Sequence, residues 1–128
     1  MKTVVHNILG TPYTVKFGTK EELNITEEYM GECRVYSKEI LICIERGGCT
    51  DDELREKTKE ILAHEIFHAY LNESGVEIEE EVEEKLATFF MKNWGKMSKS
   101  MIELFYDDEL NNILEDRLWE ITKEKSIL

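Results

Sequence analysis

The chain has 128 residues, of which 41% are hydrophobic and 34% are charged, and its formal net charge is −12. This length suits one ordinary domain, and the composition is typical of a soluble folded protein. The acidic excess argues against nucleic-acid binding, which needs clustered Lys and Arg. No apolar run approaches the roughly 18 residues that span a bilayer, and the N-terminus has no signal-peptide pattern. We therefore expect a cytoplasmic protein with no membrane contact.

The first half of the chain is typical of β-structure. Alternating apolar residues predict strands over Thr3–Leu9 and Tyr13–Phe17, and a second pair over Gly31–Tyr36 and Glu39–Ile44. The polar segment Lys20–Tyr29 fits either a loop or a short helix. If the second pair forms a hairpin, one of its faces lies on the core side and carries Cys33, Val35, Ile40, Ile42 and Ile44.

The second half is typical of α-structure and begins with a strong helix signal. Thr50 and Glu53 have the spacing of a capping box, in which each side chain binds the other residue's backbone N–H. A helix is therefore predicted from about Asp51 to Asn72, and Ser74-Gly75 supplies its end.

Further helical stretches follow this first long helix. One is predicted from Glu77 to Trp94, with Gly95 as its end, and Met97–Lys125 continues with apolar residues at helical spacing and a break near Asp107-Asp108. The predicted fold is therefore α+β, with a small N-terminal antiparallel sheet packed on the first long helix. We expect one domain over residues 1–128, with about 97–128 as a helical extension.

The segment Ile61–Leu71 carries the chemistry, because it contains the pattern His-Glu-x-x-His. On a helix, His64 and His68 project from one face, and their ring nitrogens can reach one zinc ion at about 2.0–2.1 Å. Glu65 is then placed to act as general base on the zinc-bound water. The apolar neighbours support this reading, because burying these groups without a partner is costly. The competing interpretation is a chance match by core or surface histidines.

A catalytic zinc site needs a third protein ligand and one open position for water. The only other histidine, His6, lies in the first predicted strand, so a carboxylate from the next helix is expected. The sequence offers several candidates there, namely Glu77, Glu79, Glu80, Glu81, Glu83 and Glu84. The apolar phase of that helix slightly favours Glu79 over Glu80, because Val82 and Leu86 share the face of Glu79. The predicted site is His-His-Glu.

The three cysteines, Cys33, Cys43 and Cys49, form an odd set that matches no standard disulfide framework. We expect reduced thiols with mostly structural roles. An alternative is a closed, purely structural zinc site, in which one of these cysteines lies next to His68 as a fourth ligand.

The stretch HEIFHAYLNESGV followed by EEEVEEKLATFF resembles the ImmA/IrrE-like zinc metallopeptidases, especially the short forms of phages and prophages. The resemblance covers about Lys2–Asn93 and is specific in HEIFHAYLNESG. It implies a zincin fold with His64 and His68 as zinc ligands and Glu65 as the catalytic glutamate.

The resemblance also bears on the third ligand. Aligning Leu86-Ala87 with the apolar-Ala pair of the family makes Glu80 the third zinc ligand, with Glu79 as the alternative. It puts Glu84 where the family has Asp or Asn. The extension after about residue 97 has no counterpart in the resemblance.

The resemblance implies a zinc metalloendopeptidase that cleaves a protein or peptide, with a repressor-type regulator as one candidate substrate. Tyr70, Tyr106 and His6 are candidate donors to the oxyanion, and an edge strand near Glu39–Ile44 is expected to bind the substrate by β-addition. The alternative function is a catalytically inactive zincin-fold module that binds a regulatory protein through the acidic stretch Glu73–Glu84. The oligomeric state is left open.

Overall fold

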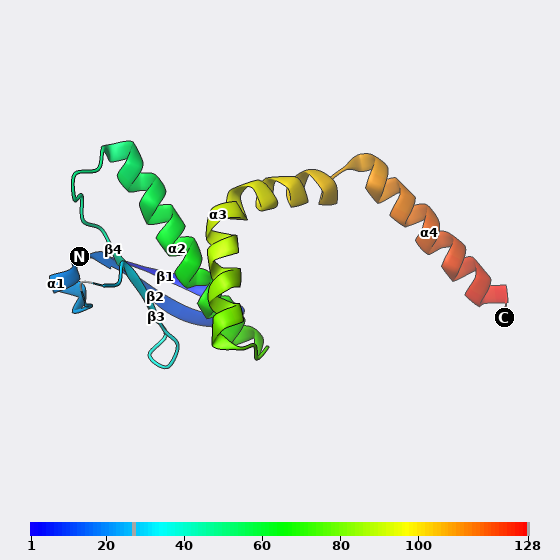
Figure 1. The fold of residues 1–128 in the computed structure, drawn as a ribbon. Helices are drawn as coiled ribbons and strands as arrows, with labels where there is room; N and C mark the ends of the chain where they lie inside the picture. The colour runs from blue at the N-terminus through cyan, green and yellow to red at the C-terminus, as the bar shows by residue number, and fades with distance from the viewer. Residues whose placement is uncertain (27, 128) are drawn as a thin grey trace. The chain divides into compact units, whose positions relative to one another are not determined.

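The chain folds as an α+β protein, as the sequence predicted, with a small four-stranded sheet followed by long helices (Figure 1). The computed structural model describes residues 1–26 and 28–127. The elements, in chain order, are β1 (Lys2–Ile8), β2 (Thr11–Gly18), α1 (Lys20–Leu23), β3 (Gly31–Arg34), β4 (Glu39–Cys43), α2 (Asp51–Ser74), α3 (Glu80–Phe105) and α4 (Asp108–Ile127).

The chain divides into two compact units, an N-terminal unit, Met1–Lys92, and a C-terminal unit, Asn93–Leu128. The boundary lies inside α3, so the C-terminal unit begins slightly before the predicted extension at about residue 97. Over the described residues, no helix has both the length and the apolar composition that a membrane span requires.

The sheet is mixed, with the strand order β1-β2-β4-β3. Both predicted hairpins are confirmed, because β1 pairs antiparallel with β2, and β3 pairs antiparallel with β4. The prediction of a purely antiparallel sheet is wrong, since β2 and β4 run parallel. The chain leaves β2 through α1, forms β3 as the outer strand and returns as β4 in the middle, which is the crossover that a parallel pair requires.

This topology also corrects the predicted edge strand. The segment Glu39–Ile44 contains β4, which lies between β2 and β3 and has both of its hydrogen-bonding edges occupied. The strand at this edge of the sheet is instead β3, Gly31–Arg34, which pairs only with β4 over the described residues.

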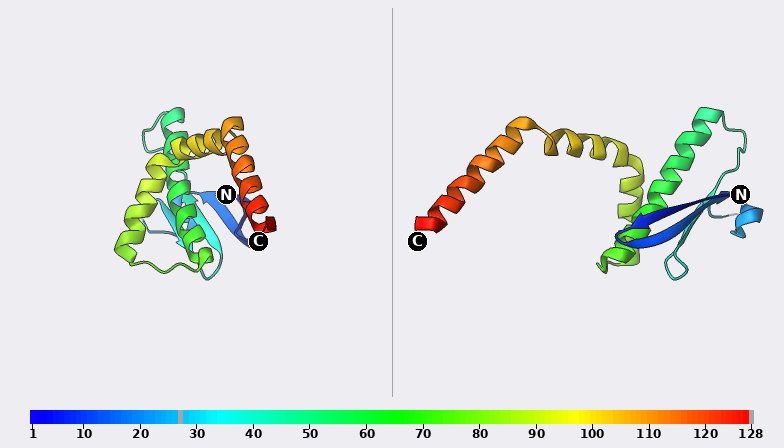
Figure 2. Two further views of the ribbon diagram at one scale, coloured as in Figure 1. Left: turned by 90° about the vertical axis from the view of Figure 1, so that its right-hand side faces the viewer. Right: turned by 180° about the vertical axis from the view of Figure 1, so that it is seen from behind.

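One face of the sheet packs against α2 and forms the core (Figure 1; Figure 2). The buried side chains of this core are Ile8, Tyr13, Val15, Ile40, Ile42 and Ala69. Cys33, Ile40 and Ile42 lie on this face as predicted, whereas Val35 and Ile44 fall outside the strands. Each fully buried Val or Ile contributes about 1.5–3 kcal/mol, so this contact fixes α2, and the residues it carries, on the sheet.

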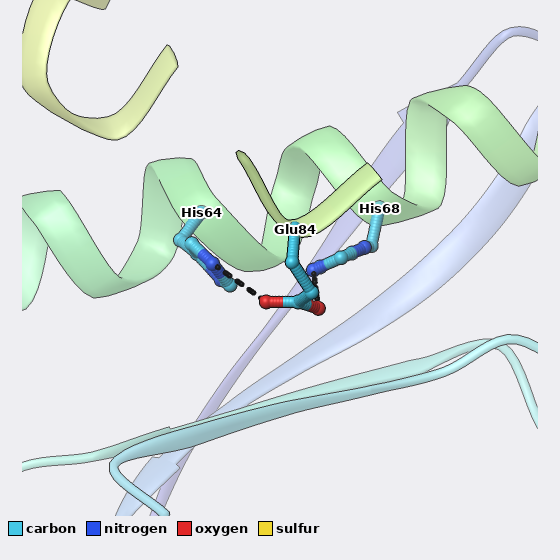
Figure 3. Close-up of side chains that lie close together, drawn as sticks. All are labelled: His64, His68 and Glu84. Carbon is cyan, nitrogen blue, oxygen red and sulfur yellow. Dashed lines mark ion pairs between the residues drawn. The ribbon is translucent and has the colours of Figure 1, made fainter. Parts of the chain in front are cut away.

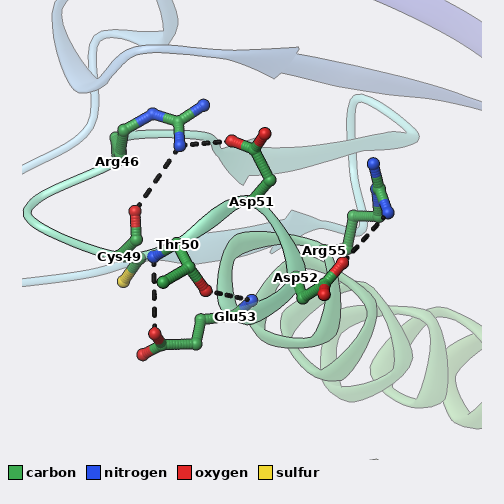
Figure 4. A network of polar contacts seen from close by, with 7 residues as sticks. All are labelled: Arg46, Cys49, Thr50, Asp51, Asp52, Glu53 and Arg55. Carbon is green, nitrogen blue, oxygen red and sulfur yellow. Dashed lines mark hydrogen bonds and ion pairs between the residues drawn. The ribbon is translucent and has the colours of Figure 1, made fainter.

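The N-terminus of α2 is fixed by the predicted capping box (Figure 4). The Thr50 hydroxyl accepts from the backbone N–H of Glu53, and the Glu53 carboxylate accepts from the N–H of Thr50. Arg46, in the loop before α2, forms an ion pair with Asp51, the first residue of the helix. The helix ends at Gly75, whose φ of 74° is the left-handed conformation that favours glycine. The helix extends to Ser74, two residues past the prediction.

The second long helix, α3, differs from the prediction at both ends. It begins at Glu80 instead of Glu77, and it continues through Gly95 to Phe105. Gly95 keeps a negative φ and therefore does not terminate the helix. The predicted break near Asp107-Asp108 is confirmed, since α3 and α4 are separated there and the Asp107 carboxylate accepts from the Leu110 N–H at 2.9 Å.

Glu73 ties the C-terminal end of α2 to the sheet. Its carboxylate accepts from Thr11 Oγ1 at 2.9 Å, from Tyr13 Oη at 2.7 Å and from Lys38 Nζ at 2.6 Å. The Lys38 ammonium, together with the hydroxyls of Tyr13 and Thr11, lowers the pKa of Glu73 to about 2. The sequence placed Glu73 only in an acidic stretch, so this anchor was not predicted.

Candidate metal centre

Two histidines of α2 converge on one carboxylate of α3 (Figure 3). The Nε2 atom of His64 lies 3.4 Å from Glu84 Oε2, and the Nε2 atom of His68 lies 3.0 Å from Glu84 Oε1. The two imidazole rings lie edge to face with their centroids 5.0 Å apart. The predicted convergence of His64 and His68, one helical turn apart, is therefore present in the structure.

These three residues have the chemistry and the spacing of a zinc site. One ligand atom from each of His64, His68 and Glu84 lies within 4.8 Å of the others. Ligand atoms at about 2.0–2.1 Å from a tetrahedral zinc ion are roughly 3.3 Å apart from one another. This is close to the 3.4 Å and 3.0 Å that separate the Nε2 atoms of His64 and His68 from the Glu84 oxygens. Two imidazoles and one carboxylate also form a donor set found in catalytic zinc sites, so the residues fit this metal.

Each histidine has a second carboxylate partner on its other ring nitrogen. His68 Nδ1 is hydrogen-bonded to the carboxylate of Glu83, and His64 Nδ1 lies 3.2 Å from Glu65 Oε1. A carboxylate at Nδ1 favours the tautomer with the proton on that atom and leaves the Nε2 lone pair available for a metal. Both rings are therefore oriented with Nε2 toward Glu84.

The carboxylates also change the proton affinity of His64. The hydrogen bond to Glu65, together with the charges of Glu65 and Glu84, raises the pKa of His64 although its burial acts in the opposite direction. Because a metal binds only neutral imidazole, protonation competes with metal binding more strongly at this ring than at an isolated histidine.

Glu65 is the buried acid of the site, with 8% of its surface exposed. It reaches the cleft because β3 approaches α2 closely at Gly31. A Cβ atom at Gly31 would lie 2.7 Å from Ile61 Cγ2 and 3.0 Å from Glu65 Cγ. The absence of a side chain at Gly31 therefore leaves the space in which Glu65 lies beside the sheet edge.

The centre opens into a cleft of about 710 Å³ in the N-terminal unit. Its walls come from the edge strand β3 and its flanks, from α2 and from the first turns of α3. The lining residues are Tyr29, Gly31, Glu32, Cys33, Val35, His64, Glu65, His68, Glu80, Glu83 and Glu84. The two histidines are only partly buried, so the centre is accessible from this cleft and is not enclosed in the core.

The structure places the predicted third ligands next to this group but not in it. Glu80 is the first residue of α3 and lines the cleft, whereas Glu79 precedes the helix and its backbone carbonyl accepts from the N–H of Glu83. Glu84 lies one helical turn after Glu80, on the same face, and it is the carboxylate that meets both histidines. The helix α3 begins at Glu80 and not at Glu77 as predicted. As a result, the helical turn that faces His64 carries Glu84 and not Glu79 or Glu80.

Two of the three predicted oxyanion donors, His6 and Tyr70, do not line the cleft. His6 lies on β1, the strand at the opposite edge of the sheet from β3, and Tyr70 lies on α2 without lining the cleft. Tyr106 belongs to the C-terminal unit. Among the described residues, the tyrosine that lines the cleft is Tyr29, in the polar segment Lys20–Tyr29 that carries no functional motif.

Among the described residues, no cysteine belongs to the group formed by His64, His68 and Glu84. All three cysteines are free thiols, and only Cys33 lines the cleft among the residues that the structure describes. Burial, and then the charges of Glu65 and Glu83, raise the pKa of Cys33 to about 12.

Comparisons of the chain with protein-family models, with curated proteins and with solved structures found no match. The assignment of chemistry to this centre therefore depends on the geometry of its own residues.

Proposed function

We propose that the chain is a zinc-dependent metallopeptidase of the zincin type, similar to the ImmA/IrrE-like enzymes, that cleaves a protein or peptide in the cytoplasm. The observation that carries the proposal is the convergence of His64 Nε2, His68 Nε2 and the Glu84 carboxylate in an open cleft. The same cleft holds a buried acid, Glu65, directly beside the first histidine. Three ligands with an open side are the arrangement of a catalytic zinc site.

The residues of the cleft supply the steps of peptide hydrolysis. When bound by His64, His68 and Glu84, zinc would supply Lewis acidity that polarises a carbonyl and makes water more acidic. Glu65 accepts a proton from the water as the water oxygen bonds to the scissile carbonyl carbon. Glu65 then gives that proton to the amine as the carbon–nitrogen bond breaks. Tyr29 also lines the cleft, and its hydroxyl is the candidate donor to the oxyanion.

The edge strand β3 is suited to hold an extended substrate next to these residues. Over the described residues β3 pairs only with β4, so its outer edge offers backbone N–H and C=O groups. Gly31, Glu32 and Cys33 of this strand line the cleft. A peptide added to this edge would pass beside Glu65, and the main-chain hydrogen bonds would fix its register.

The test uses a degenerate peptide library with the purified full chain, with and without a chelator. Wild-type protein is expected to cleave peptides, and the chelator is expected to stop cleavage. Glu65→Gln is expected to keep its zinc, because the amide oxygen still accepts from His64 Nδ1, but to lose cleavage. Glu81→Gln, on the exposed side of α3, is the matched control and is expected to behave as wild type. Full activity of Glu65→Gln would contradict the mechanism.

The second candidate is a catalytically inactive module of the same fold that binds a regulatory protein. The observation favouring it is that the Glu65 carboxylate is engaged by His64 Nδ1, as expected for a group that orients a ligand. Glu80 adds acidic surface to the cleft for a basic partner. Intact peptides in the same library experiment, with zinc bound and a basic protein retained, would favour this candidate.

A further inference from the structure

A second hollow of the N-terminal unit adjoins the cleft at His68, and we refer to it as the side pocket. Its volume is about 520 Å³, and its lining comes from the last turns of α2, the connection from α2 to α3 and the end of β3. The side pocket and the cleft share three lining residues, Val35, His68 and Glu83. His68 also belongs to the metal centre. A ligand that reaches the centre therefore lies directly beside the side pocket.

Aliphatic side chains form much of the wall of the side pocket. Four of its nine lining residues are aliphatic, namely Val35, Leu71, Val76 and Ile78. All four keep part of their surface accessible, and Val76 is 57% exposed. Exposed apolar residues that are scattered singly are ordinary, but these four line one hollow next to the metal centre. Burial of this surface against an apolar group is favourable, so the side pocket is suited to an aliphatic side chain.

The charges of the side pocket discriminate between polar ligands. Its acidic residues are Glu77 and Glu83, and over the described residues neither the side pocket nor the cleft is lined by Lys or Arg. Glu83 is already hydrogen-bonded to His68 Nδ1, and Glu77 is exposed, so solvent screens its attraction for a cation. The side pocket therefore favours an aliphatic side chain over a basic one, and a basic one over an acidic one.

The edge strand β3 connects the cleft with the side pocket. Gly31, Glu32 and Cys33 of this strand line the cleft, and Val35, the first residue but one after Cys33, lines both hollows. An extended peptide paired with this edge directs alternate side chains to the same face. A peptide that passes the metal centre along β3 therefore presents one of its side chains to the side pocket.

We propose that the side pocket binds an aliphatic side chain of the substrate, from a residue that flanks the cleaved bond. The preferred substrates are then peptides with Leu, Ile, Val or Met at that position. The cleavage preference rests on the proposed peptidase function, whereas the binding preference rests on the side pocket alone. A single methylene in an apolar pocket changes kcat/KM by about 10–200-fold, so Leu is expected to exceed Ala by at least ~10-fold.

Peptide binding tests the side pocket without hydrolysis. Glu65→Gln protein with added zinc is incubated with a degenerate peptide library, and the retained peptides are sequenced by mass spectrometry. The retained pool is expected to be enriched in aliphatic residues and depleted in Asp and Glu. A retained pool without aliphatic enrichment, or no retained peptide at all, would overturn the proposal.

A change of specificity separates the side pocket from a merely structural role. Val76→Asp in the same Glu65→Gln background is expected to move the enrichment from aliphatic residues to Lys and Arg. A misfolded variant would lose peptides but would not gain basic ones. Val5→Asp, on β1 at the opposite edge of the sheet, is the matched control and is expected to retain the same peptides as Glu65→Gln alone. An unchanged aliphatic enrichment in Val76→Asp would overturn the assignment.

Cleavage by the wild type distinguishes the side pocket from the proposed peptidase function. Sequencing of the products is expected to place an aliphatic residue beside the cut, with the preference of Leu over Ala given above. Cleavage without that preference, or with a preference for Lys, would overturn the side pocket and leave the peptidase function standing. Aliphatic enrichment in the retained pool without chelator-sensitive cleavage would support the side pocket and refute the peptidase function.

Discussion

His68 is held between two neighbouring glutamates of α3, with Glu83 at its Nδ1 atom and Glu84 at its Nε2 atom. Adjacent residues of one helix therefore contact opposite sides of one imidazole. Glu83 sets the ring orientation and tautomer, and Glu84 completes the group of donors on the other side. This relationship assigns different roles to two carboxylates that the sequence presents only as part of an acidic run.

The first prediction concerns the orienting role of Glu83. Glu83→Ala leaves all three proposed zinc ligands in place but removes the acceptor for His68 Nδ1. We expect zinc affinity to fall by about 10–100-fold, the range usual for an outer partner of a metal ligand. Competition with a chromogenic chelator measures this change. Glu81→Ala is the control, and an unchanged affinity for Glu83→Ala would refute the assigned role.

The second prediction separates the candidates for the third ligand. Glu84→Ala is expected to weaken zinc binding by more than the roughly 100-fold upper range for an outer partner. Glu80→Ala and Glu79→Ala, measured in the same chelator competition, are expected to cause smaller losses. A larger loss in Glu80→Ala than in Glu84→Ala would favour the assignment implied by the ImmA/IrrE resemblance over the geometry of the structure.

The third prediction concerns the close approach of β3 to α2. Gly31→Ala would place a methyl group 2.7 Å from Ile61 Cγ2 and 3.0 Å from Glu65 Cγ. Overpacking of this kind costs about 1–3 kcal/mol of folding stability, and it displaces Glu65. We expect kcat to fall while zinc content is unchanged.

A second substitution tests the cause of that effect. Ile61→Leu removes the γ-methyl branch nearest to the new methyl group at nearly constant volume. Adding Ile61→Leu to Gly31→Ala is therefore expected to restore part of kcat and of the unfolding free energy. No recovery of either quantity would mean that the steric contact with Ile61 does not cause the loss.

The fourth prediction uses the anchor of α2 at Glu73. The pKa of Glu73 is about 2 in the folded protein, below its ordinary value of 4.5. A lowered pKa means that this carboxylate stabilises the fold above pH 4.5 and that its contribution is lost as the pH falls toward 2.

Urea unfolding of wild type and Glu73→Gln at a series of pH values measures that contribution. The wild type is expected to be the more stable of the two above pH 4.5, and the difference is expected to shrink as the pH falls toward 2. A difference that stays constant over this interval would show that the charge of Glu73 does not stabilise the fold.

The sequence predicted the parts of this structure that depend on local patterns. The capping box at Thr50 and Glu53, the two hairpins and the His-Glu-x-x-His helix all depend on residues close together in the chain. The parallel pairing of β2 with β4 depends on a crossover, which alternation of apolar residues does not encode.

The register of α3 shows the same limit at the metal centre. Whether Glu79, Glu80 or Glu84 meets the histidines depends on where α3 begins, and several consecutive glutamates supply equivalent chemistry. Gly95 has the identity of a helix terminator, but it continues the helix because its backbone keeps a negative φ. At the metal centre the outcome depends on how two helices meet, which a local pattern does not contain.

The central claim is that His64, His68 and one carboxylate bind a single zinc ion. X-ray absorption at the zinc edge, on the full chain purified without added zinc, measures this directly. The expected spectrum has two imidazole nitrogens at about 2.0–2.1 Å with the remaining ligands oxygen, at one zinc per chain. A protein without zinc, or a zinc spectrum with sulfur ligands or no imidazole, would contradict the claim.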